Sequence, residues 1–265
     1  MATKQSTLPA LLNSDTIKNR FVEVLGKDAA TFSSALLNIY NSNKQLQECD
    51  AWSILGAAGL AATLKLSITP SLGQAYIVPF RGRATFQIGW KGLVQLAHRT
   101  ERFVRLHAGK IYEGEIKSFN PITGDPERGE KISDTVVGYV AYMKLVNGFE
   151  KTIYMSVAEI EAHAEKYSQS YSYDKKSGKK TSPWSTNFDS MASKTVLKKL
   201  LGTWGRLSVE ITNAIQGDQS VVDKNTFTYV DNGGDSQNRG EIFTADDEPE
   251  TINLETGEIT EVNHE

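Results

Sequence analysis

The first 65 residues repeat a helical pattern that is broken by short polar stretches. Apolar side chains recur three and four positions apart in three segments, which begin near Ser14 or Asp15, after Asp28 and after Asp50. The side chain of each Ser or Asp can accept hydrogen bonds from the free N–H groups of a first helical turn. The third segment is rich in Gly and Ala, which suits close packing in the core or against another subunit. The pattern predicts a helical N-terminal part.

The pattern changes to a strand-like period after Pro70. AYIVPF and ATFQI flank RGR, which predicts a hairpin, and RFVRLHAGKIY has the same strand character. Between them, WKGLVQLAHRT has helical spacing, with Lys91, Gln95 and His98 on its polar face. TVVGYVAYMKLV and GFEKTIYMS predict a second hairpin that turns at the Asn-Gly pair of residues 147–148.

Helical spacing returns in the last third of the folded part. Ser156 and Glu159 have the capping-box spacing that starts a helix. Residues 168–186 are poor in aliphatic side chains and are expected to form a long loop. NFDSMASKTVLKKLLGTW then predicts a stronger helix, with an apolar stripe that includes Leu197 and Leu201.

The two ends of the chain differ from its middle. We expect a flexible arm over residues 1–13, one folded domain over residues 14–216 and an acidic, disordered tail over residues 217–265. Residues 1–215 hold 27 Lys or Arg against 19 Asp or Glu, whereas residues 216–265 hold 2 against 13. A basic body with an acidic tail is common among proteins that handle nucleic acid, although such a tail can also serve only solubility. Deletion of residues 217–265 should leave the domain folded.

Composition excludes several classes of protein. The single Cys49 rules out an internal disulfide framework and offers no zinc-binding spacing. The chain has neither an apolar run of about 18 residues, as a membrane span needs, nor a signal peptide, so we expect a soluble, cytoplasmic protein. GxxxxGKS, GxxxxGKT, HExxH and GxSxG motifs are all absent. We therefore predict no catalytic residue and no nucleotide site.

Positive charge gathers in residues 75–110, which hold seven Arg or Lys against one acidic residue, Glu101. Cations neutralise phosphates and exposed rings stack on bases, so a segment with both is typical of a single-strand binder. A second group of cations lies on the predicted helix 187–204 and just after it. The candidate DNA-binding residues are Arg81, Arg83, Trp90, Lys91, Gln95, His98, Arg102, Arg105, Lys110, Lys194, Lys198, Lys199 and Arg206.

Several of these residues also have a structural interpretation. Trp90 lies close to Gly89 and Gly92, and its ring could either stack on a base or fill the core. The lysines of the predicted loop, at positions 175, 176, 179 and 180, could contact phosphate or only be solvated.

A metal site is the weakest of the candidates. Four carboxylates in a turn-rich region could be imagined as a nuclease metal site: Glu113, Glu115, Asp125 and Glu127. No group of His or Lys residues lies near them in the sequence. We therefore predict no metal.

Two runs of sequence resemble a known family. AYIVPFRGRATFQIGWKGLVQLAHRTERFVRLHAGKIYEGE resembles the central signature of the RecT family of phage-encoded single-strand annealing proteins. SPWSTNFDSMASKTVLKKLLGTW resembles the second signature of that family, and the resemblance covers residues 15–215 in register. Trp90 stands where relatives often carry Tyr, which preserves a flat ring. GTWGRLSVE contains less Pro than the family pattern has.

The resemblance implies an α+β fold in which a bent antiparallel β-sheet and its hairpins are crossed by helices, a Rad52-like annealing core. It implies ATP-independent annealing of complementary single strands in phage-type homologous recombination. The folded domain would bind DNA and assemble into a homo-oligomeric ring or helical filament inside the bacterial host cell.

The resemblance also implies partners. These are a 5′→3′ exonuclease and a host single-strand-binding protein. No cofactor is implied, and a non-essential effect of Mg²⁺ on annealing is compatible with it. The alternatives are a plain single-strand DNA- or RNA-binding protein and a metal-dependent nuclease.

Overall fold

The computed structural model describes residues 7–120, 122–205, 208–223, 226–229, 251–252 and 259–260. The chain divides into two compact units, Met1–Asp231 and Asn232–Glu265. In the second unit, β10 (Thr251–Ile252) and β11 (Ile259–Thr260) pair antiparallel. The other residues of that unit, and the disorder expected of them, lie outside the described residues. The other helices and strands belong to the first unit.

The N-terminal part is helical, as predicted. Its helices are α1 (Leu8–Asn13), α2 (Asp15–Leu25), η1 (Gly26–Asp28), α3 (Ala29–Ser42), α4 (Lys44–Gln47) and α5 (Ala51–Thr63). Asp50 caps α5, because its carboxylate accepts the N–H of Ser53 at 2.9 Å. The expectation of a flexible arm is wrong for residues 8–13. Leu8 and Leu12 of α1 are buried, since α1 packs against α2 and α5.

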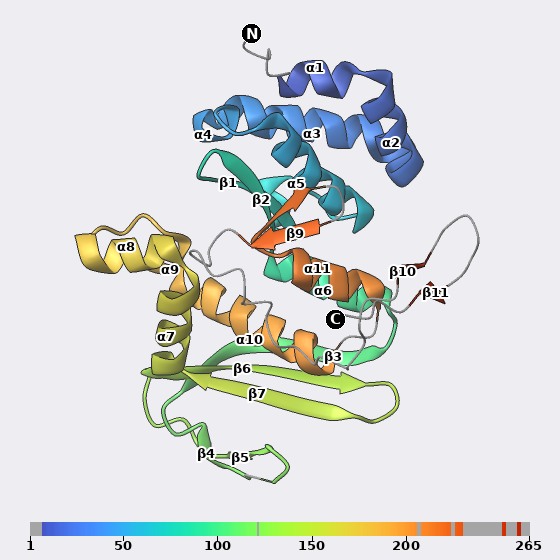
Figure 1. Cartoon of the computed structure of the whole chain (residues 1–265). Helices are drawn as coiled ribbons and strands as arrows, with labels where there is room; N and C mark the ends of the chain where they lie inside the picture. The colour runs from blue at the N-terminus through green and yellow to red at the C-terminus, as the bar shows by residue number, and fades with distance from the viewer. Residues whose placement is uncertain are drawn as a thin grey trace. The chain divides into compact units, whose positions relative to one another are not determined.

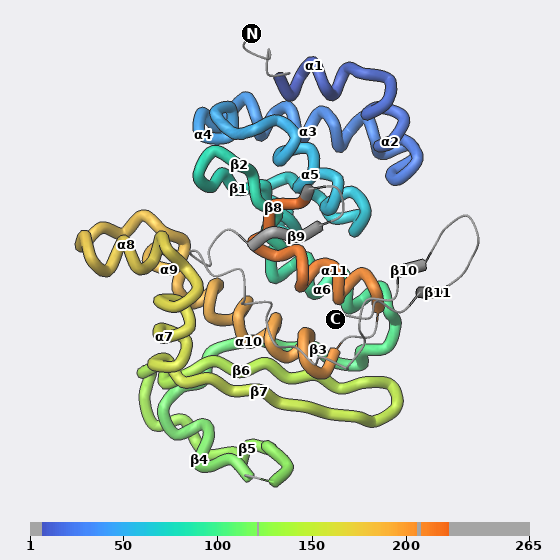
Figure 2. Tube along the Cα trace, in the orientation of Figure 1, coloured from blue at the N-terminus to red at the C-terminus, as the bar shows by residue number. Residues whose placement is uncertain are grey.

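The first sheet joins distant parts of the chain. After η2 (Pro70–Leu72), β1 (Ala75–Phe80) and β2 (Arg83–Ile88) form the predicted hairpin, whose turn residues Arg81 and Gly82 both have positive φ. β8 (Ser220–Asp223) pairs with β2 (Figure 2). β9 (Thr226–Tyr229) pairs with β8. α5 packs on β2 and β8. Gly56 permits this, because a Cβ there would lie 2.2 Å from the carbonyl oxygen of Val222.

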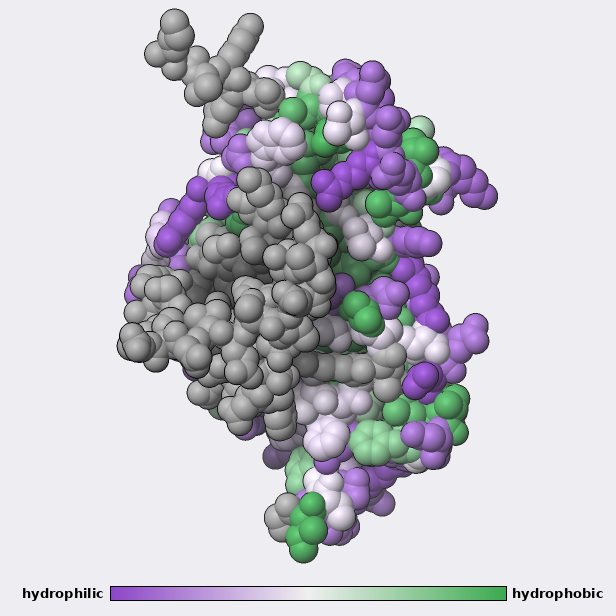
Figure 3. Space-filling model, turned by 45° about the vertical axis from the view of Figure 1, so that its right-hand side comes forward, coloured by the Kyte–Doolittle hydropathy of each residue, from purple (hydrophilic) through white to green (hydrophobic). Residues whose placement is uncertain are grey.

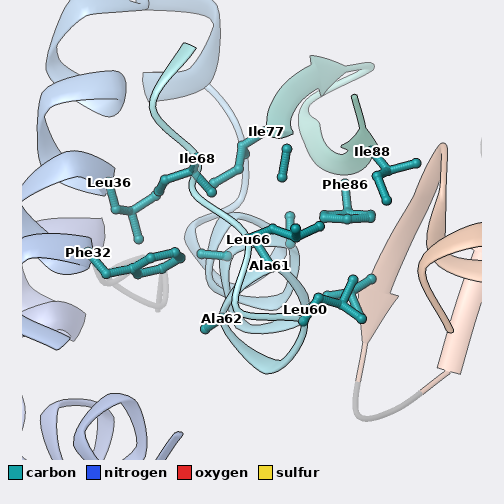
Figure 4. Close-up of a cluster of buried hydrophobic side chains, with 14 of the residues drawn as sticks. Phe32, Leu36, Leu60, Ala61, Ala62, Leu66, Ile68, Ile77, Phe86 and Ile88 are labelled. Atoms are coloured by element: carbon teal, nitrogen blue, oxygen red, sulfur yellow. The ribbon is translucent and has the colours of Figure 1, made fainter. Parts of the chain in front are cut away.

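The larger hydrophobic core lies between the N-terminal helices and this sheet. Side chains from α3, α5, β1 and β2 point toward one another around the segment that follows α5 (Figure 4). Leu36 and Phe86 are fully buried in it. The small residues of α5 thus serve the core of the chain itself, which was one of the two expectations for them.

The second sheet is built from β3 (Phe103–Tyr112), β6 (Val136–Leu145) and β7 (Glu150–Ser156) in the order β3-β6-β7, all antiparallel. α10 (Phe188–Trp204) lies across one face of it (Figure 1). α6 (Trp90–Arg99) and α11 (Val209–Gly217) connect this layer to the first sheet, since α10 contacts both. A separate hairpin, β4 (Ile116–Phe119) with β5 (Pro126–Arg128), follows β3.

The predicted long loop 168–186 is mostly helical, so that expectation is wrong. α7 (Val157–Tyr167) starts at the predicted capping box and is followed by α8 (Gln169–Ser177) and α9 (Pro183–Thr186). Tyr171 and Trp184 anchor these two short helices, with ring centroids 6.0 Å apart and both side chains buried. The low aliphatic content was misleading because buried aromatic side chains pack this segment instead.

The folded part continues beyond residue 216, so the expected domain boundary is also wrong. Asp218, next to β8, is buried and forms ion pairs with Lys198 at 2.7 Å and Lys194 at 3.3 Å, both from α10. The same carboxylate accepts the N–H of Ile88 in β2 at 2.9 Å. Val221 in β8 is only 1% exposed. Residues 218–223 are therefore structural.

The architecture confirms the α+β class, with antiparallel sheets crossed by helices (Figure 1). The strands belong to separate sheets that are linked by α6, α10 and α11. Within the described part of the chain, no helix has both the length and the apolar character that a membrane span requires.

Candidate nucleic-acid interface

The sheet β3-β6-β7 has one covered face and one open face. α10 packs on the covered face, where alternate side chains of β6 are buried. Because side chains alternate along a strand, Arg105 and His107 of the edge strand β3 point to the open face. Their partners across the strand pair are Lys144 and Tyr142. The open face thus presents polar and cationic side chains.

A groove with a volume of about 930 Å³ lies along β3, beside the open face and the β4–β5 hairpin. Apolar side chains such as Val104, Ile111 and Ile116 contribute to its lining. Its acidic, basic and histidine residues are His98, Arg105, His107, Lys110, Glu115, Arg128 and Glu150. The combination of apolar lining and cations is the one that a nucleic-acid strand needs for its bases and phosphates.

Both carboxylates of the groove are engaged by donors of the protein. Glu150 forms an ion pair with Lys144 and accepts the hydroxyl of Tyr142 at 2.6 Å, and these hydrogen bonds lower the pKa of Glu150. Glu115 accepts the N–H of Tyr112 at 2.7 Å. Arg105 and Arg128, in contrast, are exposed.

The polar face of α6 extends the groove. Lys91, Gln95 and His98 are all exposed, as the sequence predicted, and His98 lines the groove. Seven residues of helix correspond to about 10 Å. A strand that follows this face from Lys91 would therefore reach the groove at His98.

Trp90 is exposed to 45%, so its ring is not part of the core. The two glycines near it have an intramolecular role. A Cβ at Gly89 would lie 2.0 Å from the carbonyl oxygen of Gly73, and one at Gly92 would lie 2.1 Å from that of Gln74. They allow the first turn of α6 to pack on residues 73–74, which leaves the ring of Trp90 at the surface.

Trp90→Ala is expected to weaken single-strand binding by about 1–3 kcal/mol, the contribution of one aromatic–base stack. The free energy of unfolding should fall by less than the roughly 3–5 kcal/mol lost with a buried Trp. Titration with DNA and thermal melting of the same variant test both parts, and Trp90→Phe should retain most of the affinity. A large fall in melting temperature with normal binding by the folded fraction would contradict a stacking role.

The other arginines of the 75–110 segment have different environments. Arg81, at the β1–β2 turn, donates to Gln169 of α8 at 2.8 Å and lies over the ring of Phe80. Arg83 is half-buried, whereas Arg102 is exposed just before β3. Arg99 donates to the carbonyl oxygens of Leu64 and Lys65 at 2.6 and 2.7 Å, at the end of α5. Of these residues, Arg102 lies nearest in sequence to the groove-lining residues of β3.

Lys110 lines the groove but has a partner. It forms an ion pair with Asp189 of α10 at 2.5 Å, and this hydrogen bond raises the pKa of Lys110. Asp189 also accepts the hydroxyl of Tyr139 at 2.6 Å. Lys110 therefore joins α10 to the sheet and offers the groove only a partly neutralised charge.

The lysines of α10 do not act as one group. Burial tends to raise the pKa of Asp218, but the charges of Lys194 and Lys198 outweigh it and lower this pKa. Burial also lowers the pKa of Lys194, whose side chain is 12% exposed. Asp218 engages both lysines, so their charges are compensated within the fold. Lys199 is exposed, and Arg206 lies outside the described residues.

Lys198→Ala is expected to lower the free energy of unfolding by about 2 kcal/mol, because a buried carboxylate loses a charged hydrogen-bond donor. Lys199→Ala, at an exposed position on the same helix, should change it by about 0.5 kcal/mol or less. Urea unfolding of the two variants makes the comparison. If Lys198→Ala kept full stability and instead reduced the salt dependence of DNA binding, Lys198 would be a phosphate contact.

Three of the four carboxylates considered for a metal have separate hydrogen-bond donors. Glu113 accepts the hydroxyl of Ser133 at 2.8 Å, and Glu127 accepts that of Ser118 at 2.9 Å. Glu115 accepts the backbone N–H of Tyr112. Across the described ranges, no three His, Cys, Asp or Glu side chains are grouped so that they could hold a metal ion.

Two groove residues were missing from the sequence-based set. His107 could have been included, because it lies two positions after Arg105 and shares its face of the strand. Arg128 gave no such signal. It lies in a segment expected to be a turn-rich loop, and the hairpin β4–β5 that brings it to the groove contains a register shift between Ile116 and Ser118.

Comparison with known proteins agrees with the signatures in the sequence. The profile of the RecT family matches residues 30–231. The chain is 43% identical to the uncharacterized protein YqaK of Bacillus subtilis (strain 168) over 212 residues, which are 79% of this chain and 71% of YqaK. It is 26% identical to protein RecT of Escherichia coli (strain K12) in an alignment of 233 residues that covers 82% of each chain.

The chain therefore belongs to the RecT family. Members of this family are DNA recombination proteins that anneal single strands. The matched region ends at residue 231, where the first compact unit also ends. This agreement supports a domain that ends after residue 216 and includes β8 and β9.

Proposed function

We propose that this protein binds single-stranded DNA in the groove along β3 and anneals it to a complementary strand without ATP. The observation that carries the proposal is the groove itself, where the exposed Arg105 and Arg128 stand beside an apolar lining. Family membership supports the same activity. The contacts with DNA are proposed for Trp90, Lys91, Gln95, His98, Arg102, Arg105, His107, Lys110 and Arg128.

The physical mechanism rests on binding energy. Cations hold phosphates of the first strand through charge, which is independent of sequence. The base edges then stay free, and an incoming strand can sample registers by brief pairing. Correct pairing adds stacking and hydrogen bonds along the strand, which lock the duplex. No step of this mechanism consumes a nucleotide or requires a metal ion.

A fluorescence annealing assay with two complementary oligonucleotides tests the proposal. Annealing should be accelerated without ATP and in the presence of a chelator, and Mg²⁺ should alter the rate without being essential. A protein that only coats strands would slow their pairing. Loss of strands that the chelator abolishes would indicate a nuclease. Either of these two results would overturn the proposed function.

We further propose that the protein works as a homo-oligomer, a ring or a helical filament, and that a 5′→3′ exonuclease supplies its single strands. A host single-strand-binding protein is a second proposed partner. Eight residues of α5 are buried within the chain, so this helix offers less contact surface than its small residues suggested. The exposed Val22 of α2 and Trp52 of α5, at 54% and 59%, are the apolar side chains we propose for a subunit contact.

Trp52→Glu is expected to shift the protein toward smaller species, because a buried charge opposes association. Sedimentation velocity measures the change, with Trp204→Glu as a control at another exposed Trp. Where the face in Figure 3 is coloured by hydropathy, apolar side chains are scattered among hydrophilic ones. An unchanged distribution of species for Trp52→Glu would place the subunit contact elsewhere.

A further inference from the structure

A second cationic surface lies on α8 and on the residues just after it, in the segment that the sequence predicted to be a loop. It consists of Tyr173, Lys176, Lys179 and Lys180, and we call it the basic knob. All four side chains are exposed, and none of them lines the groove. The knob is therefore distinct from the interface already described.

Asp174 gives the knob its shape. Asp174 is only 2% exposed. Its carboxylate accepts the N–H groups of Thr181 and Ser182 at 2.9 and 2.7 Å. It also accepts the hydroxyls of Thr181 and Ser185, both at 2.7 Å. These bonds, led by the one from the Thr181 hydroxyl, lower the pKa of Asp174 well below its usual range. The carboxylate thus fixes the 178–182 segment against α8 and α9.

The lysines of the knob are exposed, whereas the carboxylate of Asp174 is buried. All four donors to Asp174 are neutral, so no lysine is used to compensate it. Lys175 is the one lysine of the segment that forms an ion pair with a described residue, Glu165. Lys176, Lys179 and Lys180 remain directed to solvent on a fixed backbone. Lysines on a mobile loop lose more conformational freedom on binding than these do.

An aromatic ring accompanies these cations. Tyr173 is 55% exposed, and the ammonium group of Lys179 lies 5.8 Å from the centre of its ring. Exposed rings beside cations can stack on bases while the cations hold phosphates. The first residue of α8, Gln169, accepts a hydrogen bond from Arg81 of the β1–β2 turn. Two further arginines, Arg81 and Arg83, thus lie on the hairpin that contacts α8.

We propose that the basic knob is a second binding surface for single-stranded DNA, which captures the incoming strand while the first strand occupies the groove. This inference rests on the proposed function. Annealing brings two polyanions together, and a protein that covers only one of them leaves their repulsion in place. A second cationic surface lowers that barrier and raises the local concentration of the incoming strand.

A capture assay separates this inference from annealing itself. Protein preloaded with one oligonucleotide is mixed with a second, labelled and non-complementary oligonucleotide, and the bound label is measured by fluorescence anisotropy. The double variant Lys176→Gln/Lys180→Gln should bind the first strand within about twofold of the unaltered protein, but should capture the second strand about tenfold more weakly. Annealing of complementary strands should slow by a similar factor.

Two matched variants complete the design. Lys176→Arg/Lys180→Arg preserves the charge and should capture the second strand normally. Lys27→Gln/Lys65→Gln removes the same charge from exposed positions outside both surfaces and should have no effect. Unchanged capture by Lys176→Gln/Lys180→Gln would overturn the inference, as would an equal loss for first and second strands. If the unaltered protein captures a second strand, the double variant does not, and the unaltered protein still fails to anneal, the proposed function fails while the knob remains a second binding surface.

Discussion

Deletion of residues 217–265 is expected to unfold the protein, whereas deletion of residues 232–265 is expected to leave the first unit folded. The longer deletion removes β8, whose Val221 is buried against the core, and Asp218, the buried partner of Lys194 and Lys198. Far-ultraviolet circular dichroism and thermal melting of the two truncated proteins test the expectation.

The size of the effect follows from two losses. Exposure of a buried Val costs about 1.5–3 kcal/mol. Leaving a buried charge without its partner costs about 3–5 kcal/mol. Together they approach the roughly 5–15 kcal/mol by which a whole domain is stable. Asp218→Asn in the full chain isolates the second loss. A cooperative unfolding transition in the protein truncated at residue 216, at the temperature of the intact chain, would contradict this account of the boundary.

The double variant Arg105→Ala/Arg128→Ala is expected to weaken binding of single-stranded DNA by a factor on the order of one hundred. Hydrogen bonds to charged groups contribute about 1.5–3 kcal/mol each, and 1.4 kcal/mol corresponds to tenfold in affinity. Each lost phosphate contact should also reduce the slope of log affinity against log salt by about 0.7. Titrations at several salt concentrations measure both effects.

The matched control for this variant is Arg20→Ala, at an exposed position on α2. It should leave both the affinity and the salt slope unchanged. Because Arg105 and Arg128 are exposed, the double variant should melt within a few degrees of the unaltered protein. Equal losses of affinity for unrelated sequences are expected, since phosphates carry no sequence information. A normal salt slope in a folded double variant would remove these arginines from the interface.

The local parts of the fold could be predicted from the sequence because their signals are local. The Asp50 cap of α5, the capping box at Ser156 and the turn at Arg81-Gly82 each depend on a few neighbouring residues. The α+β class was implied by the family resemblance, and the change of period near Pro70 is consistent with it. The polar face of α6 followed from helical spacing alone.

The errors concern contacts between residues far apart in the chain. SVVD, the sequence of β8, does not indicate that Ser220 pairs with Phe86 of β2. Asp218, which bonds to Ile88 130 residues earlier, looked like one more charge of an acidic tail. Lys198 and Lys199 are neighbours with the same chemistry, yet only Lys198 meets Asp218. Arg128 reached the groove through a hairpin whose register a sequence pattern does not encode. Pairing of this kind is decided by packing, which periodicity does not report.

The central claim is that the groove along β3 holds single-stranded DNA. Photo-crosslinking from a benzoylphenylalanine introduced at His107, with a second variant carrying it at Trp52, tests this claim most directly. The account predicts that DNA is crosslinked at position 107 whatever the sequence of the strand, and that the yield falls as the salt concentration rises. Crosslinking at position 52 with none at position 107 would contradict it.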